Sequence, residues 1–511
     1  MRKYALISVS DKNGVETLAK GLSELGFTIL SSSGTASYLR EFCPDLVDVS
    51  DFTGFPEILD GRVKTLHPKI HAGILADRSK QEHLETLAEH GIEKIDLVAV
   101  NLYPFAQTRR KANAETQEII ENIDIGGPCL LRAAAKNHAC VTVLCDPADY
   151  SEILNQIQEN GETSFETRQK LARKAFEHVR DYDAEIADYF LSQEKTTDSE
   201  LPSTLKIDST LQKTLRYGEN PHQKAGIYAK PVVVLSLLHG LELSFNNHLD
   251  VAATLQALRL FDSPAVVIVK HCNPCGIGIA SKLAEAYEKA FAADTQSPFG
   301  GIVGMNRPLD LETANLIDRI FTEIIIAPAY EPGVLDFLRR KKNRRLIQAG
   351  SELSNKAGWE LKDLPQGWLL QSRDHVLETP ESWDIVTQRK PDPAELEALS
   401  FAWKTVSLLR SNAIALTGAD RVFGFGAGQT SRIDALHLAL WKAQKFGHDL
   451  SGAVCASDGF FPFRDSIDEL HAHGIRAIVQ PGGSKGDPDV ISACDSFGIT
   501  MLFTGVRHFR H

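Results

Sequence analysis

The feature that most constrains the fold is a regular alternation of short apolar runs and amphipathic stretches along the first 145 or so residues. Between the first two runs, Val15, Leu18 and Leu22 recur at the spacing of one helix face. Strands that alternate with helices are typical of a parallel sheet. We therefore predict a Rossmann-type α/β layer whose strands are YALISVS, FTILSSS, DLVDVSD, DLVAVNLYPF and ACVTVLCDPADY.

The length of 511 residues indicates more than one domain, because single hydrophobic cores stop growing at roughly 250–300 residues. A polar segment, SQEKTTDSELPSTLKIDST, follows a helical region and indicates a domain boundary. We expect one domain at 1–195, with its core at about 1–146, and another at 200–511. A charged stretch with several prolines interrupts the α/β pattern of the second domain, which we expect to divide at about 365–395.

The formal net charge of −12 argues against general nucleic-acid binding, which needs a basic surface, but not against a small anionic ligand. The apolar runs have the length of strands, well below the roughly 18 residues that span a bilayer. The N-terminal MRKYALISVSD becomes polar too early for a signal peptide. We expect a cytoplasmic protein with no membrane or nucleic-acid partner.

The eight cysteines are scattered, and only Cys272 and Cys275 form a Cys-x-x-Cys pair. A structural zinc site usually combines two such pairs. Zinc deaminases need Pro-Cys-x-x-Cys, whereas Pro274-Cys275 is followed by no second cysteine at that spacing. A redox pair stays open, although the glycines that follow do not favour the helix on which such pairs lie. We expect no metal.

Polar clusters in the first domain follow predicted strands, where α/β proteins bind ligands. One is Ser10-Asp11-Lys12, and another is Ser32-Ser33-Gly34-Thr35, which leads into a helix. Hydroxyls and free N–H groups at a helix start suit a phosphate, although helix capping explains the same residues. Arg62 and Lys64 point the same way on an extended segment and favour an anion nearby.

A third cluster, NIDIGGPCLLRAAAKN, joins a tight glycine turn to a helix. Asp124 precedes the turn and Lys136 lies near the end of the helix. One interpretation places both residues in one pocket. The alternative is a loop followed by an ordinary amphipathic helix.

The second domain has denser signals. The segments TLRYGENPHQKA and LSFNNHLD crowd hydrogen-bonding side chains around turns, and glycine-rich loops carry Arg432, Asp458 and Asp465. Neither a dinucleotide fingerprint nor a Walker A motif is present in these loops. The phenylalanines of GFFPF suit stacking on a flat heterocycle, or a place in the core.

The segment VKHCNPCG places Lys270 and His271 where a buried strand, AVVIVK, gives way to a loop. We expect the sharp bend at residues 273–276, because proline and glycine favour turns. Histidine exchanges a proton near neutral pH and lysine can stabilise a developing anion. The pair therefore indicates acid–base chemistry.

Taken in order, SVSDKNG, SSSGTASYL, DGRVKTLHPKIHAGIL, IDIGGP, LRYGENPHQKA, VKHCNPCGIG, GAGQTSR, SDGFFPFRDSID and RHF identify a family. The chain closely resembles the bifunctional AICAR transformylase/IMP cyclohydrolase enzymes of purine biosynthesis over nearly its whole length. The resemblance implies formyl transfer from 10-formyltetrahydrofolate to the 5-amino group of AICAR, then dehydrating closure of formyl-AICAR to IMP. It implies an N-terminal methylglyoxal-synthase-like domain and two cytidine-deaminase-like subdomains without zinc.

The resemblance also implies roles for residues of the transformylase. His271 matches the base and Lys270 the group that stabilises the oxyanion or the departing folate nitrogen. The family usually has Asp where this chain has Glu323, which weakens that one assignment. The positions that match AICAR contacts are Arg216, Tyr217, Gly300, Glu323, Asn412, Arg432 and Arg507, and those that match folate contacts are Phe460, Asp465, Gly482 and Gly483.

For the cyclohydrolase, Lys136 matches the proposed acid–base residue, with Asp124, Tyr103 and Lys64 around it. The matching nucleotide contacts are Ser10, Asp11, Lys12, Ser32, Ser33, Gly34, Thr35, Arg62, Thr65, Asn101 and Gly126. The implied partners are AICAR, formyl-AICAR, IMP and folate, in a homodimer with transformylase sites at the interface. No transition metal is implied, and a monovalent cation is compatible with the family. A nucleotide-sensing protein and a zinc or redox enzyme are the alternatives.

Overall fold

The structure is a computed structural model that describes residues 2–193, 201, 204, 205, 207, 209–229, 235–350, 359–374 and 378–511. It divides into two compact units, Met1–Thr204 and Leu205–His511, which are described separately. Residues 194–200 of the expected boundary segment, and 375–377 of the expected split, lie outside the described residues. Among the described residues, no helix combines the length and apolarity needed to cross a bilayer.

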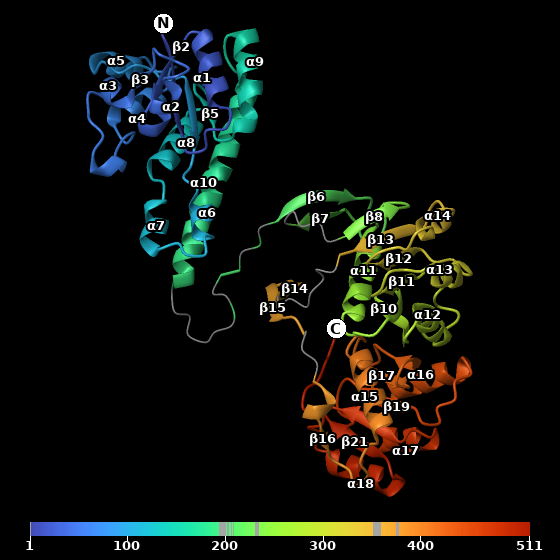
Figure 1. Cartoon of the computed structure of the whole chain (residues 1–511). Helices are drawn as coiled ribbons and strands as arrows, with labels where there is room; N and C mark the ends of the chain where they lie inside the picture. Colours follow the sequence, from blue (N-terminus) through green and yellow to red (C-terminus); the bar gives the residue numbers. More distant parts are fainter. Residues whose placement is uncertain are drawn as a thin grey trace. The chain divides into compact units, whose positions relative to one another are not determined.

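The first unit contains a five-stranded parallel sheet of order β3-β2-β1-β4-β5, which confirms the predicted α/β layer (Figure 1). Its central strands are buried on both faces, as parallel strands are, which explains their near-continuous apolar sequence. The strands are β1 (Lys3–Val9), β2 (Phe27–Ser31), β3 (Val47–Asp48), β4 (Leu97–Asn101) and β5 (Thr142–Leu144).

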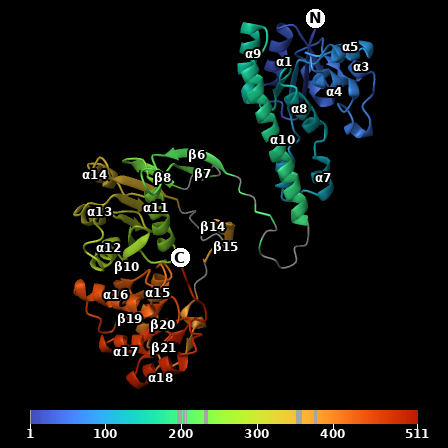
Figure 2. The same cartoon turned by 180° about the vertical axis from the view of Figure 1, so that it is seen from behind.

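Helices cover this sheet, and the longest, α10, lies along α8 in both views (Figures 1 and 2). The helices are α1 (Val15–Glu24), α2 (Ser33–Leu39), α3 (Val49–Thr53), α4 (Pro68–Leu75), α5 (Gln81–Glu89), α6 (Phe105–Arg109), α7 (Thr116–Glu121), α8 (Gly126–Lys136), α9 (Tyr150–Asn160) and α10 (Phe165–Gln193), with 3-10 turns η1 (Leu59–Gly61) and η2 (Pro147–Asp149). Their apolar faces join the strands in one core.

The second unit contains two six-stranded sheets. The first has the order β10-β9-β11-β12-β13-β8 and the second has β18-β17-β19-β20-β21-β16. The first sheet is built from β8 (Leu235–His239), β9 (Ala265–Lys270), β10 (Asn273–Ile279), β11 (Ile302–Met305), β12 (Ile324–Ala327) and β13 (Arg345–Ala349). The second is built from β16 (Asp384–Ile385), β17 (Ile414–Thr417), β18 (Val422–Gly426), β19 (Val454–Ser457), β20 (Ala477–Gln480) and β21 (Thr500–Phe503).

The two sheets share one topology. In each, an edge hairpin is followed by an antiparallel neighbour, two parallel strands and a final antiparallel strand. Their helices also correspond, α11 (Phe245–Leu258), α12 (Leu283–Ala292), α13 (Leu311–Asp318) and α14 (Val334–Leu338) in one, and α15 (Pro393–Val406), α16 (Arg432–Lys445), α17 (Asp465–Ala472) and α18 (Asp487–Phe497) in the other. The leading helices α11 and α15 both start with a capping box.

Glycines hold the hairpin of each half against a helix. A Cβ atom on Gly276 of β10 would lie 1.8 Å from the carbonyl oxygen of Ala290 in α12. A Cβ atom on Gly426 of β18 would lie 1.7 Å from the carbonyl oxygen of Ala435 in α16. Only glycine permits this approach of backbone to backbone. One hydrophobic cluster contains residues of both halves, which explains why they form a single unit.

Two small hairpins complete the second unit. They are β6 (Thr210–Leu215) with β7 (Ala225–Ala229), and β14 (Trp359–Leu364) with β15 (Gly367–Ser372). A 3-10 turn, η3 (Pro380–Ser382), precedes β16. The β14–β15 hairpin lies within the charged stretch for which the sequence predicts no pattern. Trp359, Leu361, Trp368 and Leu370 share one of its faces, but none of its residues is buried.

Candidate active sites

A cavity of about 760 Å³ opens at the carboxyl ends of β1, β2 and β4 in the first unit. Its lining combines hydroxyls, backbone amides and cations with the exposed carboxyl group of Glu121 and the half-buried one of Asp124. It brings together most of the residues that the resemblance assigns to the cyclohydrolase, namely Ser10, Lys12, Ser32, Ser33, Gly34, Thr35, Arg62, Lys64, Thr65, Asn101, Tyr103, Asp124 and Gly126.

Lys12 is fixed at one side of this cavity. Its Nζ atom donates to Thr35 Oγ1 over 3.0 Å and also to the carbonyl oxygen of Val9. Burial lowers the pKa of Lys12, against the opposing charge of Asp11. A partly desolvated cation beside hydroxyls suits an anionic group. Because α2 has only seven residues, Lys12 and the hydroxyls contribute more to this site than a helix dipole would.

Asn101 braces the loop after β1. Its Oδ1 atom accepts from the backbone N–H of Asp11 over 3.0 Å, and its Nδ2 atom donates to the carbonyl oxygen of Asp11 over 2.9 Å. The side chain of Asp11 instead accepts from the N–H of Asn13 over 3.0 Å. Asp11 therefore shapes the loop without appearing in the cavity lining, in contrast to its expected direct role.

Asp124 lies at the other side, before α8. Its Oδ1 atom accepts from the N–H of Gly127 over 2.8 Å, and its own N–H donates to the Tyr182 hydroxyl over 2.8 Å. Burial raises the pKa of Asp124, although hydrogen bonds from Gly127 and Tyr103 and the charge of Lys64 oppose the rise. A carboxyl group shifted toward neutral pH suits proton transfer.

Lys136 does not lie in this cavity. Helix α8 starts beside Asp124 and carries Lys136 to its far end, about 15 Å away at 1.5 Å per residue. There Lys136 lines a second cavity with His71, Arg132 and Phe176. The interpretation that placed Asp124 and Lys136 in one pocket does not hold within a single chain, because the length of α8 separates the two residues.

In the second unit, Lys270 ends β9 and His271 occupies the turn to β10. His271 and Cys272 have φ values of 52° and 60°, which two-residue hairpin turns of type I′ require. The expected bend at 273–276 is wrong, because these residues belong to β10. Pro274 is tolerated there because β10 is an edge strand with a register shift between Pro274 and Gly276.

Neighbouring elements hold this turn. The N–H of Cys272 donates to Asp250 Oδ1 of α11 over 2.6 Å. The Nζ atom of Lys270 donates to the carbonyl oxygen of Phe299 over 2.8 Å, which brings Lys270 beside Gly300. Gly300 has a φ of 73°, and its N–H donates to Phe321 over 2.7 Å. The turn is thereby fixed while the His271 ring stays exposed.

Glu323 immediately precedes β12 and contacts the first turn of α11 through Asn247. Its Oε1 atom accepts from Arg345 over 2.9 Å and from Asn247 Nδ2 over 3.2 Å. These two donors fix the side chain of Glu323. The sequence singles out Asn247 and Asp250 within LSFNNHLD without giving them a partner, and it does not single out Arg345, since the partners of all three are distant in sequence.

Arg216 and Tyr217 precede a closed loop. The Arg216 guanidinium lies 5.6 Å from the centre of the Tyr217 ring. Gly218 N–H donates to the carbonyl oxygen of Gln223 over 2.9 Å, and Asn246 Nδ2 ties the loop to α11 through the carbonyl oxygen of Glu219 over 3.2 Å. The loop and the His271 turn therefore contact one helix.

In the second half, Arg432 starts α16 and forms a buried ion pair with Asp458. Its second amino group donates to Asn412 Oδ1 over 2.8 Å, so both residues expected to bind AICAR are in contact. Asp458 also accepts from the N–H of Ala413 over 3.0 Å and from the Ser411 hydroxyl. The expected contact Arg507 lies over the Phe509 ring, 4.5 Å from its centre.

The residues expected to contact folate lie on two loops of the same half. Phe460 is 43% exposed and Phe463 68%, so neither ring is held in the core. Asp465 starts α17. Gly482 and Gly483 have φ values of 72° and 94°, and a Cβ atom on Gly482 would lie 2.4 Å from the Phe503 ring. Glycine is therefore required at this turn whatever it binds.

The cysteines of the hairpin are not arranged as reactive thiols. Burial raises the pKa of Cys275 to about 12, and burial with the charge of Asp250 raises that of Cys272. Both thiols therefore stay protonated at neutral pH, which disfavours attack or ligation. Within the described ranges, no group of three or more His, Cys, Asp or Glu side chains is placed to hold a metal ion.

Comparisons with known proteins agree on one family. The sequence profile of the "AICARFT/IMPCHase bienzyme" matches residues 134–442, and that of the "MGS-like domain" matches residues 14–129. Similar curated proteins, each at 49% identity over 100% of both chains, are the "Bifunctional purine biosynthesis protein PurH" of Persephonella marina and of Enterococcus faecalis. A solved structure, "Crystal structure of ForH", is 37% identical and covers 37% of this chain and 100% of its own, with a TM-score of 0.34.

Proposed function

The chain belongs to the AICARFT/IMPCHase bienzyme family, and we propose how its residues divide the two reactions of that family. It is a bifunctional enzyme that transfers a formyl group to AICAR and closes formyl-AICAR to IMP, the last two steps of purine biosynthesis. We assign ring closure to the first unit and formyl transfer to the second.

The observation that carries the assignment of ring closure is the cavity at the strand ends of the first unit. It gathers Lys12, Thr35 and Asp124 from three separate segments. We propose that Lys12, Arg62 and the hydroxyls bind the 5′-phosphate. The carboxamide nitrogen of formyl-AICAR then attacks the formyl carbon within one molecule, so positioning supplies much of the rate.

In this step the carboxamide nitrogen loses one proton as it attacks, and the formamido nitrogen loses a second as the ring double bond forms. The formyl oxygen gains both protons and leaves as water. We propose that Asp124 moves a proton, because its pKa is raised and it faces the cavity. Tyr103 and Lys64 lie in the same lining and orient the reacting groups. We assign Lys136 no contact with nucleotide bound in the first cavity of its own chain, since its side chain lines the second cavity.

For formyl transfer, we propose that His271 accepts the proton as the 5-amino nitrogen of AICAR attacks the formyl carbon. Lys270 faces the resulting oxyanion, which collapses and expels N10 of the folate with a proton. The exposed ring on a fixed turn suits this role because a base must be positioned and accessible. Arg216, Tyr217, Gly300, Glu323, Asn412, Arg432 and Arg507 are the proposed AICAR contacts.

The proposed formyl donor is 10-formyltetrahydrofolate, held near Phe460, Asp465, Gly482 and Gly483. The exposed rings of Phe460 and Phe463, together with two glycines of positive φ, suit a flat pterin. We further propose a homodimer with transformylase sites at the interface, a cytoplasmic location and no transition metal; a monovalent cation is compatible with this proposal. The dimer would cover the open surface around His271.

Mass-resolved product analysis tests the assignment. The protein is mixed with AICAR and 10-formyltetrahydrofolate beside His271→Ala. We expect IMP from the native protein and neither formyl-AICAR nor IMP from the variant. Accumulation of formyl-AICAR alone would reject the ring-closure assignment, and untouched AICAR would reject the formyl-transfer assignment. Formyl-AICAR supplied directly to His271→Ala should still be converted to IMP.

A further inference from the structure

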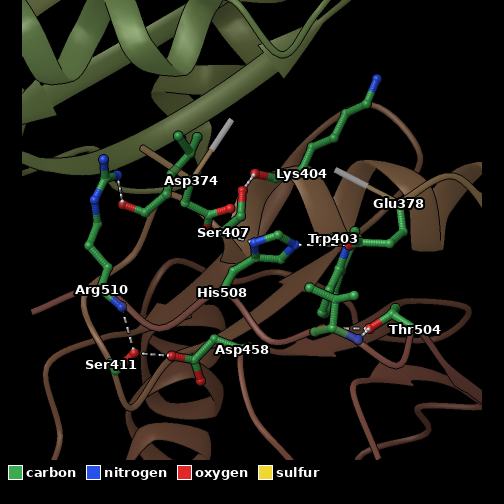
Figure 3. A network of polar contacts seen from close by, with 12 residues as sticks. Asp374, Glu378, Trp403, Lys404, Ser407, Ser411, Asp458, Thr504, His508 and Arg510 are labelled. Atoms are coloured by element: carbon green, nitrogen blue, oxygen red, sulfur yellow. Dashed lines mark hydrogen bonds and ion pairs between the residues drawn. The ribbon is translucent and has the colours of Figure 1, made fainter. Parts of the chain in front are cut away.

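His508 lies buried at the centre of a polar network near the C-terminus (Figure 3). Its Nδ1 atom lies 2.7 Å from Asp374 Oδ2, and its Nε2 atom lies 3.0 Å from Glu378 Oε2. Carboxylates accept hydrogen bonds and do not donate them, so both ring nitrogens carry a proton in this arrangement. Two ionised carboxylates on either side therefore favour the imidazolium form of His508.

The network extends into the core of the second half. Trp403 of α15 packs edge-on against the His508 ring at 5.2 Å and donates from Nε1 to Glu378 over 3.3 Å. The backbone N–H of His508 donates to the carbonyl oxygen of Asp458 over 3.3 Å. Asp458 is the residue whose carboxylate pairs with Arg432. The backbone of His508 is thus hydrogen-bonded directly to a member of that ion pair, Asp458.

The chain segment around His508 carries two arginines. Arg507 precedes it, and Arg510 follows it, with its N–H donating to the Ser411 hydroxyl over 3.1 Å. The Arg510 guanidinium donates to Gln256 of α11 and to the carbonyl oxygen of Leu408. Helix α11 also holds the His271 turn through Asp250. The segment therefore connects the two halves of the unit.

We propose that His508 is a positioning residue for AICAR binding, because its clamp between Asp374 and Glu378 fixes the C-terminal segment that places Arg507 and Arg510. This inference rests on the proposed function, since AICAR affinity is the property that reports it. His508 touches neither the reacting atoms nor the proposed base, so it acts on substrate affinity and not on the chemical step.

The charges around His508 give the proposal a pH dependence. Burial would lower the pKa of His508, but hydrogen bonds and charges from Asp374 and Glu378 outweigh it and raise the pKa. Trp403 from α15 is neutral, the Asp458 carboxylate is paired with Arg432, and the Arg510 guanidinium is directed to Gln256. As the pH rises through the raised pKa, one ring proton leaves and one carboxylate loses its donor, so AICAR affinity should fall.

The test is the KM for AICAR against pH in the full-length enzyme, with His508→Gln and Asp374→Asn as variants. Glutamine is uncharged and cannot donate to carboxylates on opposite sides. We expect His508→Gln to raise the KM about tenfold below the transition, to leave kcat within about twofold and to remove the alkaline rise in KM. Asp374→Asn should move that rise to lower pH.

Control measurements separate this inference from the function on which it rests. His437→Gln removes an exposed histidine of α16 and should leave the KM profile unchanged. Conversion of added formyl-AICAR to IMP reports the first unit and should be unchanged in every variant. If His508→Gln does not fold, the half-exposed Asp374→Asn decides the question.

A native KM profile in both variants would overturn the proposal, as would a fall in kcat at constant KM. Failure of the native enzyme to formylate AICAR would instead reject the proposed function.

Discussion

The Oδ1 atom of Asp124 accepts a hydrogen bond from Gly127 N–H over 2.8 Å, and this glycine cannot be replaced without displacing Asp124. A Cβ atom on Gly127 would lie 2.6 Å from Asp124 Oδ2 and 2.7 Å from Leu102 Cδ2. The position of the Asp124 carboxyl group therefore depends on glycine at residue 127. The turn holds the half-buried carboxyl group of Asp124, whose pKa is raised by desolvation, at the start of α8.

We expect Asp124→Asn to lower kcat for ring closure by about 10²- to 10⁴-fold, the usual effect of removing a proton-transfer group. The measurement is IMP formation from formyl-AICAR. Formyl transfer from 10-formyltetrahydrofolate to AICAR serves as the internal control, since it belongs to the other unit. Native ring closure in Asp124→Asn would remove Asp124 from the mechanism.

The same substitution should not destabilise the first unit. The pKa of Asp124 is raised in the folded state, so its ionised form is less favourable there than in the unfolded chain. Stability is therefore lost as the pH rises through the raised pKa, and Asp124→Asn removes that loss. We expect an equal or higher Tm for the variant at pH 7 and a smaller difference at pH 4, measured by calorimetry.

The buried ion pair of Arg432 and Asp458 predicts an asymmetry between single and double substitutions. Asp458→Leu leaves a buried guanidinium unpaired and should destabilise the second unit by about 3–5 kcal/mol. Arg432→Met with Asp458→Leu should recover part of that loss, because no buried charge then remains. Denaturant unfolding of the three proteins measures both effects. If the double variant is as unstable as Asp458→Leu alone, the unpaired charge is not the cause.

The hairpin turn allows backbone geometry to be separated from chemistry. Asparagine tolerates positive φ, so His271→Asn should keep the turn and the Tm but lower formyl transfer by at least about 100-fold. Cys272→Gly relieves the second positive φ and should retain formyl transfer. Rates of formyl-AICAR production give the comparison. Loss of both rate and Tm in His271→Asn would instead indicate a structural role for the ring.

Cys275→Ala tests the zinc and redox alternatives. Because the pKa of this thiol is raised to about 12, it is neutral at pH 7 and should take no part in catalysis. We expect Cys275→Ala to keep at least about half of the native formyl-transfer rate. Prolonged dialysis against a transition-metal chelator should likewise leave the native rate unchanged. A coordinated loss of activity in both experiments would restore the metal hypothesis.

Much of the fold could be predicted because its strands are buried apolar runs, as in AVVIVK, whose period and length indicate a covered sheet. The repeated topology of the second unit could not. Its two hairpins share close-packed glycines but differ at the turn, His271-Cys272 in one and residues 418–421 in the other. Strand order depends on contacts between distant segments, which one sequence does not display.

The candidate sites show the same division. Residues that follow strands, such as Lys12 and Thr35, were predicted together because parallel strands deliver their ends to one edge. Lys136 was grouped with Asp124, although the length of α8 places it about 15 Å from the helix start, where Asp124 lies. His508 belongs to the RHF segment that contributes to the resemblance, but no role could be predicted for it, since its carboxylate partners Asp374 and Glu378 precede it by more than a hundred residues.

Because the two sheets share one topology, the packing role of the β9–β10 hairpin can be separated from its proposed chemical role. Close packing of glycine on a helix is imposed on both copies, whereas the Lys270-His271 pair, proposed here to carry formyl transfer, stands on only one. The β17–β18 hairpin lacks this pair and contacts the β9–β10 hairpin through its turn. The carbonyl oxygen of Asp420 in its turn accepts from the N–H of Ile279 over 2.9 Å, so the second hairpin braces the end of the first.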